Sequence, residues 1–454
     1  MRPRLHRNAR SFLAPALAAL ALLTLACPWH VVDGAPLPSS GLVEVPNPLS
    51  GENPTYSLAN EPAPKPGASV TDTRLGTAQV RATGAQGIRH EYSRHDPFNS
   101  DCSRILLLAL QSGEWRVYKT TSLPYDADGN LVRTVEMEEP RWDSQDPNVV
   151  WGTQEFRILR VDVSTGDSTT VKDFRDDARV GPILKAESDL YRITMKDEGE
   201  ASTDRRYWAF LLQGMEQDYR ARYIFVWDRQ DDAVVGLHTL AVDESRIDWA
   251  GMSPLGNWVL IGSDYDNASP LTGLVMANRA LNSFQQIHTT TGHADVGLDS
   301  AGREVIVMQN AQTDYVDLIT LDTNARPALS DADYPASGHV PIMRLFYASD
   351  SPVGLNSGVH VSCNYPGWCV ISTTTDEGAR EQNWLDRTVT LVKLDRDRPQ
   401  VYYLAKVYGT RGSYWEETQA SISRDGSRVV WATNWNTNVG QDKVWVMELR
   451  LGAK

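Results

Sequence analysis

The sequence predicts an all-β fold, a seven-bladed β-propeller built from four-stranded antiparallel blades. The first observation behind this prediction is a hairpin pattern that occurs seven times along the 454 residues, at spacings of roughly 46 to 65 residues. The second is that apolar residues either alternate with polar ones or form short continuous runs, as they do in strands. The third is that the chain lacks the long apolar stretches of helical period that an α/β fold needs.

The clearest copy of the pattern is EETQASISRDGSRVVWATNW, residues 416–435. Polar and apolar residues alternate over residues 417–422, which predicts a strand with one buried face. Asp425-Gly426 predicts a tight turn, and the apolar run 429–432 predicts a second strand that is buried on both faces. Because one hairpin cannot bury its own surface, the copies must pack against one another.

The seven copies share a turn position that serves as an anchor for counting along each copy. The copy around Arg205 is the weakest of them. A closed ring hides the strand edges that an open solenoid would expose, so the propeller is favoured over the solenoid. The anchors are Cys102, Asn148, Arg205, Gly256, Gly302, Gly367 and Gly426.

Composition limits the classes of protein to which the chain can belong. The hydrophobic content of 41% and the 14 Trp residues are enough for a large core, so residues 86–454 are expected to form one closed propeller domain. The net charge of −14 argues against a nucleic-acid partner, which requires a basic surface.

The first 26 residues are typical of an export signal, with arginines before an apolar run at residues 12–26. The run is too short to span a bilayer comfortably, so no transmembrane span is expected in the mature chain. An extracytoplasmic location, periplasmic or secreted, is predicted. Cys27 follows the predicted cleavage site, which leaves a lipid anchor at Cys27 as an alternative to soluble secretion. Residues 27–85 are rich in Pro, Ser and Gly and are predicted to be a flexible linker.

Three cysteines lie beyond the signal. Cys363 and Cys369 occupy the two arms of one predicted hairpin, close enough for a disulfide in an oxidising compartment, although their side chains could instead face opposite ways. Cys102 stands where other copies have Gly in the turn and is predicted to be a small buried thiol.

Side chains seven and nine residues before each anchor are mostly polar, whereas those four and six before it are mostly apolar. In a propeller the innermost strands line the centre of the ring, so the polar set is expected to converge on one funnel. The convergent residues are His95 and Ser93, Arg141, His293 and Asp295, His360, and Glu417 and Gln419, with Trp249 as the apolar exception.

Three neighbouring copies, the fifth to the seventh, combine imidazole nitrogens with oxygen ligands. Such a mixture suits a divalent metal, Mn²⁺ or Ca²⁺, with Zn²⁺ as a further option. The predicted metal ligands are His293, Asp295, His360, Glu417 and Gln419.

On the other side of the funnel, His95, Arg141 and Tyr92 are the predicted catalytic residues. A histidine or phenol can move a proton while a guanidinium or metal neutralises a carboxylate, which is the chemistry of β-elimination from a uronic acid sugar. Arg94, Trp142 and Trp249 are predicted to bind the substrate, the indoles by stacking on sugars. The structural alternative is that these polar groups hold water, and that Arg141 forms a salt bridge to a neighbouring blade.

Four segments of the chain resemble the blade segments of TolB-type and oligogalacturonate-lyase-like propellers, and the likeness covers about residues 88–452. The segments are SRDGSRVVWATNW, SPLGNWVLIGSD, YSRHDPFNSDCSRILLL and EPRWDSQDPNVVW. The resemblance implies an extracytoplasmic seven-bladed propeller and, for the lyases, Mn²⁺ held by histidines and a glutamine, with a further histidine as base. This sequence has Glu417 and Gln419 where the lyases place histidines.

Two functions therefore compete. The first is a metal-assisted polysaccharide lyase acting on uronate-containing oligosaccharides. The second is a non-catalytic propeller, similar to TolB, that binds a glycan or an envelope protein. The chain is expected to be monomeric in either case.

Overall fold

Residues 32–454 form one compact unit of the computed structural model. The structure describes residues 34, 36–38, 41–50, 53–263, 267–310, 313, 315–327, 334–345, 359–374 and 384–452. The predicted export signal (residues 1–26) and Cys27 lie outside the described residues.

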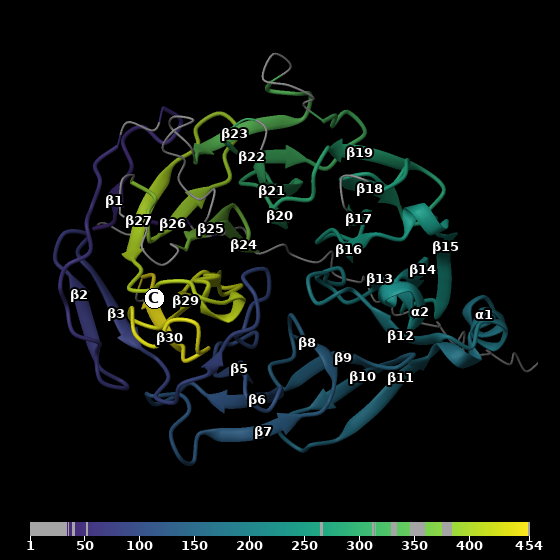
Figure 1. Ribbon diagram of the computed structural model, residues 1–454, viewed down its shortest axis with the longest axis horizontal. Coiled ribbons are helices and arrows are strands. Elements are labelled where there is room, and N and C mark those ends of the chain that lie inside the picture. Colours follow the sequence, from purple (N-terminus) through teal and green to yellow (C-terminus); the bar gives the residue numbers. More distant parts are fainter. Residues whose placement is uncertain are drawn as a thin grey trace, which may run out of the picture. The chain divides into compact units, whose positions relative to one another are not determined.

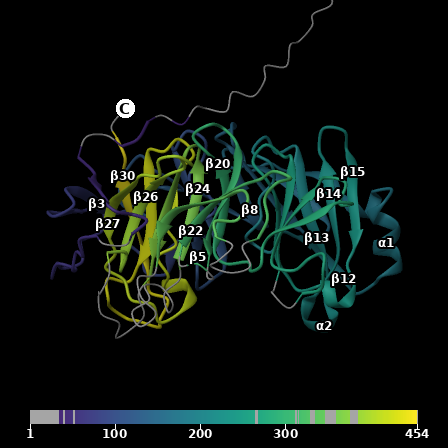
Figure 2. The same cartoon turned by 90° about the horizontal axis from the view of Figure 1, so that it is seen from above.

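Seven antiparallel sheets, counted over this described part, surround a common centre as the blades of a propeller (Figure 1), which confirms the predicted fold. Seen from above, the strands run from one face of the ring to the other (Figure 2). From the inner to the outer strand, blades 1 to 3 are β4 (Ile88–Arg89), β5 (Arg104–Ala109), β6 (Glu114–Lys119) and β7 (Leu131–Val135); β8 (Glu138–Trp142), β9 (Val149–Gln154), β10 (Arg157–Asp162) and β11 (Ser168–Asp173); and β12 (Leu190–Thr194), β13 (Tyr207–Gly214), β14 (Ala221–Asp228) and β15 (Ala233–Thr239).

Blades 4 to 6 continue the ring in the same inner-to-outer order. They are β16 (Ile247–Met252), β17 (Trp258–Ser263), β18 (Leu274–Asn278) and β19 (Phe284–His288); β20 (Ala294–Leu298), β21 (Glu304–Asn310), β22 (Tyr315–Thr320) and β23 (His339–Arg344); and β24 (Val359–Tyr365), β25 (Trp368–Thr373), β26 (Thr388–Lys393) and β27 (Val401–Lys406). The weak copy around Arg205 is thus a complete blade, the third.

Blade 7 joins the two ends of the propeller. Counted outward from the centre, its first three strands come from the end of the chain: β28 (Ser421–Ile422), β29 (Arg428–Thr433) and β30 (Trp445–Arg450). The outer two, β3 (Thr77–Arg81) and β2 (Ser69–Asp72), come from its beginning. β3 pairs with β30 in antiparallel register, Val80 opposite Glu448.

The segment predicted as a flexible linker, residues 27–85, is therefore partly structured. Besides β2 and β3 it contains β1 (Val43–Glu44), which adds a fifth strand to blade 6 beside β27. Composition did not predict these strands because β1 and β3 pair with strands more than 300 residues away, β27 and β30, rather than being stabilised by their own apolar content.

Helical structure is confined to short connections in the part of the chain that the structure describes. No helix there is long and apolar enough to cross a membrane. The helices are η1 (Phe174–Asp176), α1 (Val180–Ala186), α2 (Glu216–Tyr219), η2 (Val242–Glu244) and η4 (Tyr414–Glu416).

The apolar runs predicted to be buried on both faces fill the spaces between blades. In β29, Val429, Val430, Trp431 and Ala432 are all buried. Between blades 2 and 3 the core is aromatic, with the rings of Trp208 and Phe210 stacked at 5.7 Å between centroids.

The inner strand of blade 1 is interrupted by a loop. Arg89 pairs with Leu108 and Phe98 pairs with Ile105, so residues 90–97 stand opposite only Leu106 and Leu107. We call residues 90–97 the axial loop. Because the neighbouring strand has no room for them in register, they project from the sheet, as in an enlarged β-bulge.

A disulfide joins Cys363 and Cys369 across the hairpin of β24 and β25, with 4.2 Å between the Cα atoms. The two thiols therefore face the same way, which was one of the two alternatives. Cys102 is buried and free, as predicted, and takes a φ of 55° in the turn where other copies have Gly.

We expect the double variant Cys363→Ala/Cys369→Ala to lose about 2 kcal/mol of unfolding free energy, because a bridge over so short a loop restricts the unfolded chain only modestly. Urea unfolding of the oxidised protein and of the variant measures the difference, with Cys102→Ala as a control for the loss of a buried thiol. Equal unfolding midpoints for the double variant and the wild type would contradict this expectation.

Candidate functional site

The axial loop contacts all six other blades, which places it at the centre of the ring. The contacts from blade 7 round to blade 2 are His90 Nε2 with Gln419 O (2.5 Å), Tyr92 with His360 (5.5 Å between ring centroids), Tyr92 Oη with His293 Nδ1 (3.2 Å), Arg94 Cζ with the Trp249 ring (4.3 Å), Arg94 Nη2 with Glu198 Oε2 (3.0 Å), and His95 Nε2 with Arg141 Nη2 (2.7 Å). The centre therefore holds protein side chains where the sequence predicted only a polar lining.

The position seven residues before each anchor supplies one side chain per blade to this centre. Glu198 completes the set, although the sequence prediction did not include it. Counting back seven residues from the weak anchor Arg205 would have found it. The seven residues are His95, Arg141, Glu198, Trp249, Asp295, His360 and Gln419.

Tyr92, His293, His360 and Glu417 form a compact group that we call the histidine cluster. The imidazoles of His293 and His360 lie 4.7 Å apart between centroids, and His360 Nε2 lies 3.2 Å from Glu417 Oε2. Glu417 Oε1 pairs with Arg411 Nη1 at 2.9 Å. His293 is half-buried, whereas His360 is fully buried, so His293 is the more accessible of the two residues.

Burial sets the protonation states in the histidine cluster. Burial, together with the neighbouring His360, lowers the pKa of His293 to about 3, so its imidazole is neutral at pH 7. Burial raises the pKa of Tyr92 well above its usual value, which keeps the phenol protonated. Burial opposes ionisation of Glu417, but its contacts with His360 and Arg411 outweigh burial and lower its pKa to about 2.

The predicted metal ligands do not assemble into a metal site. Asp295 uses both carboxylate oxygens to accept backbone hydrogen bonds, from Cys363 N at 2.6 Å and from Val296 N at 2.8 Å. Gln419 Oε1 accepts from Arg89 Nη2 at 2.5 Å, and Arg411 pairs with Glu417. Guanidinium groups thus occupy oxygens that a cation would need.

Two imidazoles, His293 and His360, remain from the predicted ligand set. No group of three or more His, Cys, Asp or Glu side chains suited to a metal ion occurs among the described residues. As the described side chains lie, the donor set does not fit the predicted Mn²⁺ or Ca²⁺.

His95 and Arg141, two of the predicted catalytic residues, are buried and paired with each other. Arg141 Nη1 also forms a 2.7 Å ion pair with Glu91 Oε2 of blade 1, and Arg141 Nη2 donates to Asp197 O at 2.7 Å. This arrangement matches the structural alternative, a salt bridge between neighbouring blades. Tyr92, the third predicted catalytic residue, lies in the histidine cluster instead.

The predicted sugar-stacking residues are not exposed. Trp142 is buried and donates from Nε1 to Pro97 O at 2.8 Å, and Trp249 is 4% exposed beneath the guanidinium of Arg94. Arg94 itself is tied to Glu198. Tyr414, which the sequence prediction missed, is 50% exposed in η4 beside the histidine cluster, and its only signal was its place just before the seventh inner strand.

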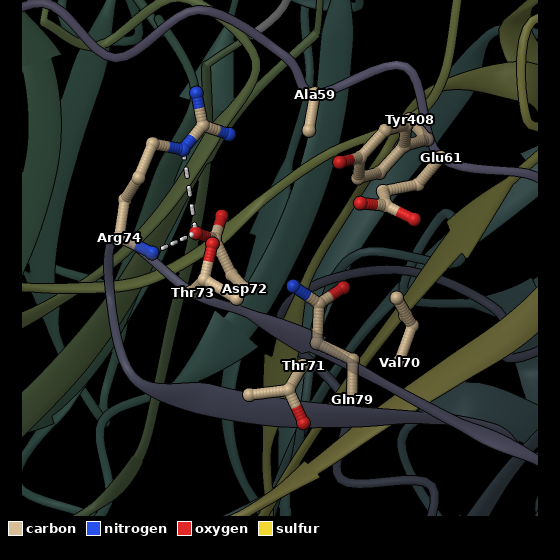
Figure 3. A pocket seen from close by; sticks show the side chains of 9 residues that line it. All are labelled: Ala59, Glu61, Val70, Thr71, Asp72, Thr73, Arg74, Gln79 and Tyr408. Atoms are coloured by element: carbon tan, nitrogen blue, oxygen red, sulfur yellow. Dashed lines mark hydrogen bonds and ion pairs between the residues drawn. The ribbon is translucent and has the colours of Figure 1, made fainter.

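A separate pocket lies outside the ring centre, between residues 59–61, the β2–β3 hairpin and Tyr408 (Figure 3). Asp72 Oδ1 accepts a hydrogen bond from Arg74 N at 2.9 Å and lies 3.5 Å from Arg74 Nε. None of the lining residues belongs to an inner strand, so this pocket is not part of the candidate site.

Two oligogalacturonate lyases of known structure are similar to this chain. One, in complex with manganese, gives a TM-score of 0.55 at 10% identity and covers 86% of this chain and 97% of its own. The other, from Vibrio parahaemolyticus, gives a TM-score of 0.55 at 11% identity with the same coverage. No protein-family model and no curated protein matches the sequence. The predicted resemblance to oligogalacturonate-lyase-like propellers is thus confirmed for the fold.

Buried carboxyl groups at the ring centre make a pH prediction possible. Burial raises the pKa of Asp295 to about 8 and that of Asp96 to about 7. In the unfolded chain these groups titrate near pH 4. Above about pH 7 the histidines of the unfolded chain are neutral, so these carboxyls make the native state bind more protons than the unfolded state, and stability must fall as the pH rises. Below about pH 6.5 the buried imidazoles of His90 and His293, whose pKa is about 3, have the opposite effect.

We therefore expect the free energy of unfolding to decrease from pH 7 to pH 8, by at most about 1.4 kcal/mol per pH unit for each carboxyl that stays protonated. Urea unfolding across this range measures the slope. Asp295→Asn should make the slope shallower, by the equivalent of up to one bound proton, whereas Glu114→Gln, on the surface, should leave the slope unchanged. A slope of zero or a rise in stability over this range would contradict the expectation.

Proposed function

We propose that the protein is an exported lyase that cleaves uronate-containing oligosaccharides by β-elimination at the histidine cluster. The observation that carries this proposal is the contact between Tyr92 and His293, with Arg94 over the Tyr92 ring and Arg411 paired with Glu417. A base, a phenol and guanidinium groups are the parts that this reaction uses.

The proposed reaction begins at C5 of the uronate, next to its carboxylate. Neutral His293 takes the C5 proton, the electron pair forms the C4=C5 double bond, and the C4–O bond to the neighbouring sugar breaks. The leaving oxygen takes a proton from Tyr92. Arg94 and Arg411 would stabilise the negative charge that develops on the carboxylate, the role that a metal ion has in other enzymes.

Two further observations support the proposal. The fold is shared with proteins described as oligogalacturonate lyases. The exposed ring of Tyr414 beside the cluster offers a surface on which a sugar can stack. Export rests on the predicted signal, and Cys27 remains the candidate position for a lipid anchor.

The test is digestion of polygalacturonate, alginate and ulvan, followed by ultraviolet absorbance of the unsaturated uronate product. Parallel digests with Mn²⁺, with Ca²⁺ and with a chelator measure any metal requirement. We expect product in all of them, because guanidinium groups already neutralise the site. Absence of product from every uronate polymer under all of these conditions would refute the proposed lyase activity.

A second candidate function is non-catalytic binding of a glycan or an envelope protein. The observation that favours it is that the axial loop fills the ring centre and leaves Trp142 and Trp249 buried. A pull-down from an envelope extract that returns one defined partner, together with absence of turnover, would establish this alternative.

A further inference from the structure

The β2–β3 hairpin, which completes blade 7, carries two buried side-chain oxygens that have no hydrogen-bond partner among the described residues. They are Asp72 Oδ2 and Gln79 Oε1, and the two residues are 8% and 1% exposed. Gln79 pairs with Val70 across the hairpin, and Asp72 is two residues beyond Val70. Because the side chains of a strand alternate between its faces, both oxygens belong to the same face of the sheet. Buried acceptors are normally satisfied, so this pair indicates a missing ligand.

The pocket between residues 59–61, the hairpin and Tyr408 adjoins this face (Figure 3). Asp72 and Gln79 both line it, and the Gln79 amide points toward the side of the pocket that carries Glu61. The cavity has a volume of about 10 Å³, which is room for a single water-sized particle. Glu61 also lines the cavity and is exposed, so solvent ions reach the cavity beside this side chain.

The phenol of Tyr408 indicates that both carboxylates face the same space. Burial raises the pKa of Tyr408, and the negative charges of Asp72 and Glu61 raise it further against the opposing charge of Arg74. Asp72 and Glu61 belong to separate segments of the chain, yet both lie near one hydroxyl group.

Arg74 does not satisfy the free oxygen of Asp72. Its backbone N donates to Asp72 Oδ1 at 2.9 Å, and its Nε lies 3.5 Å from the same oxygen. Its Nη1 donates to Ser57 O. The guanidinium group lies on the far side of Asp72 from Glu61 and Gln79 (Figure 3). Two carboxylates and one guanidinium therefore leave one net negative charge, and Asp72 Oδ2 faces away from the arginine.

A cation fits this group of oxygens better than a water molecule. Water is neutral and has two hydrogens to donate, whereas Asp72, Gln79 and Glu61 offer three acceptors. Carboxylate and amide oxygens are the ligands that calcium prefers. Calcium approaches oxygen to about 2.3–2.6 Å, closer than the roughly 2.8 Å of a hydrogen-bonded water, so it can contact oxygens that expose little surface to water.

We propose that this pocket binds one calcium ion. Its protein ligands are Asp72 Oδ2, Gln79 Oε1 and the Glu61 carboxylate, and water completes the coordination shell on the open side beside Glu61. The ion joins the stretch before β2 to the hairpin that completes blade 7. The site lies outside the ring centre and does not depend on the proposed lyase activity.

The test is isothermal titration of the purified full-length protein with calcium chloride, at an ionic strength kept constant with sodium chloride. We expect one site with a Kd of about 10⁻⁴–10⁻³ M, the range of calcium sites in extracellular modules. Calcium at about 10 mM should raise the Tm by about 2 °C, because it binds the native state, and a chelator should reverse the rise.

Two variants test the ligands. Asp72→Asn keeps an oxygen for the amides of Arg74 and Leu75 but removes the charge, so its calcium affinity should fall at least about tenfold. Gln79→Glu replaces the amide with a carboxylate and should bind calcium more tightly than the wild type does. Weaker binding by Gln79→Glu would show that Gln79 does not ligate the ion through Oε1.

The matched control is Asp162→Asn in the turn after β10. Asp162 Oδ1 accepts from Ser164 N at 2.8 Å and Thr165 N at 3.2 Å, the same two positions of the turn that Asp72 uses. This variant should keep the wild-type calcium affinity and the rise in Tm. Absence of calcium binding to the wild type, or equal affinity in the wild type and Asp72→Asn, would overturn the proposal.

Discussion

His293→Ala is expected to lower kcat/KM for release of unsaturated uronate by about 10²- to 10⁴-fold, the range that loss of a general base produces. His293 is the half-buried imidazole of the histidine cluster, it is neutral at pH 7, and its Nδ1 contacts the phenol of Tyr92. No other imidazole in the cluster combines this exposure with this contact, because His360 is fully buried.

The matched control is His238→Ala. His238 lies in β15, the outer strand of blade 3, where its Nε2 is 3.9 Å from Glu244 Oε2. Activity of this variant should equal that of the wild type, and the Tm of His293→Ala shows whether a loss of activity comes from the base or from loss of the folded state. Full activity in His293→Ala would remove this residue as the base.

Deletion of residues 1–82 is expected to reduce the free energy of unfolding by about 5 kcal/mol or more, and the chain is expected to aggregate. The deletion removes β1, β2 and β3 together with buried Val45, Leu75 and Val80, each of which contributes about 1.5–3 kcal/mol. It also leaves β30 as an open sheet edge, which promotes aggregation.

Deletion of residues 1–40 is the control, since it retains all three strands. Thermal unfolding and size-exclusion chromatography compare the two deletions. If both variants unfolded at the wild-type temperature, residues 41–82 would be a linker after all.

The repeated hairpin allowed the propeller and its inner positions to be predicted from the sequence. Each copy carries its own alternation and its own turn, so the information is local, and the complete third blade shows that even the weak copy around Arg205 was sufficient. The closing strand β3 could not be predicted in this way. Its residue Gln79 lies in a Gly-rich stretch, and it belongs to a strand because it pairs with Leu449 at the edge of β30.

The candidate site was harder to predict because its contacts are not local. The count of seven residues identifies side chains that point inward, but it does not show that residues 90–97 leave the sheet. The axial loop brings Tyr92 to His293 of blade 5 and Arg94 to Trp249 of blade 4. Nor does the sequence show that Arg89 donates a hydrogen bond to Gln419 Oε1. This bond occupies the oxygen with which Gln419 was predicted to bind a metal.

β3 is synthesised early in translation and β30 near its end. β3 therefore has to wait for β30 before the two strands can pair. The last sheet can therefore form only when nearly the whole chain is available, and contacts over such a sequence separation slow folding. Until β30 is available, β2 and β3 have no sheet to join, and blade 7 stays incomplete.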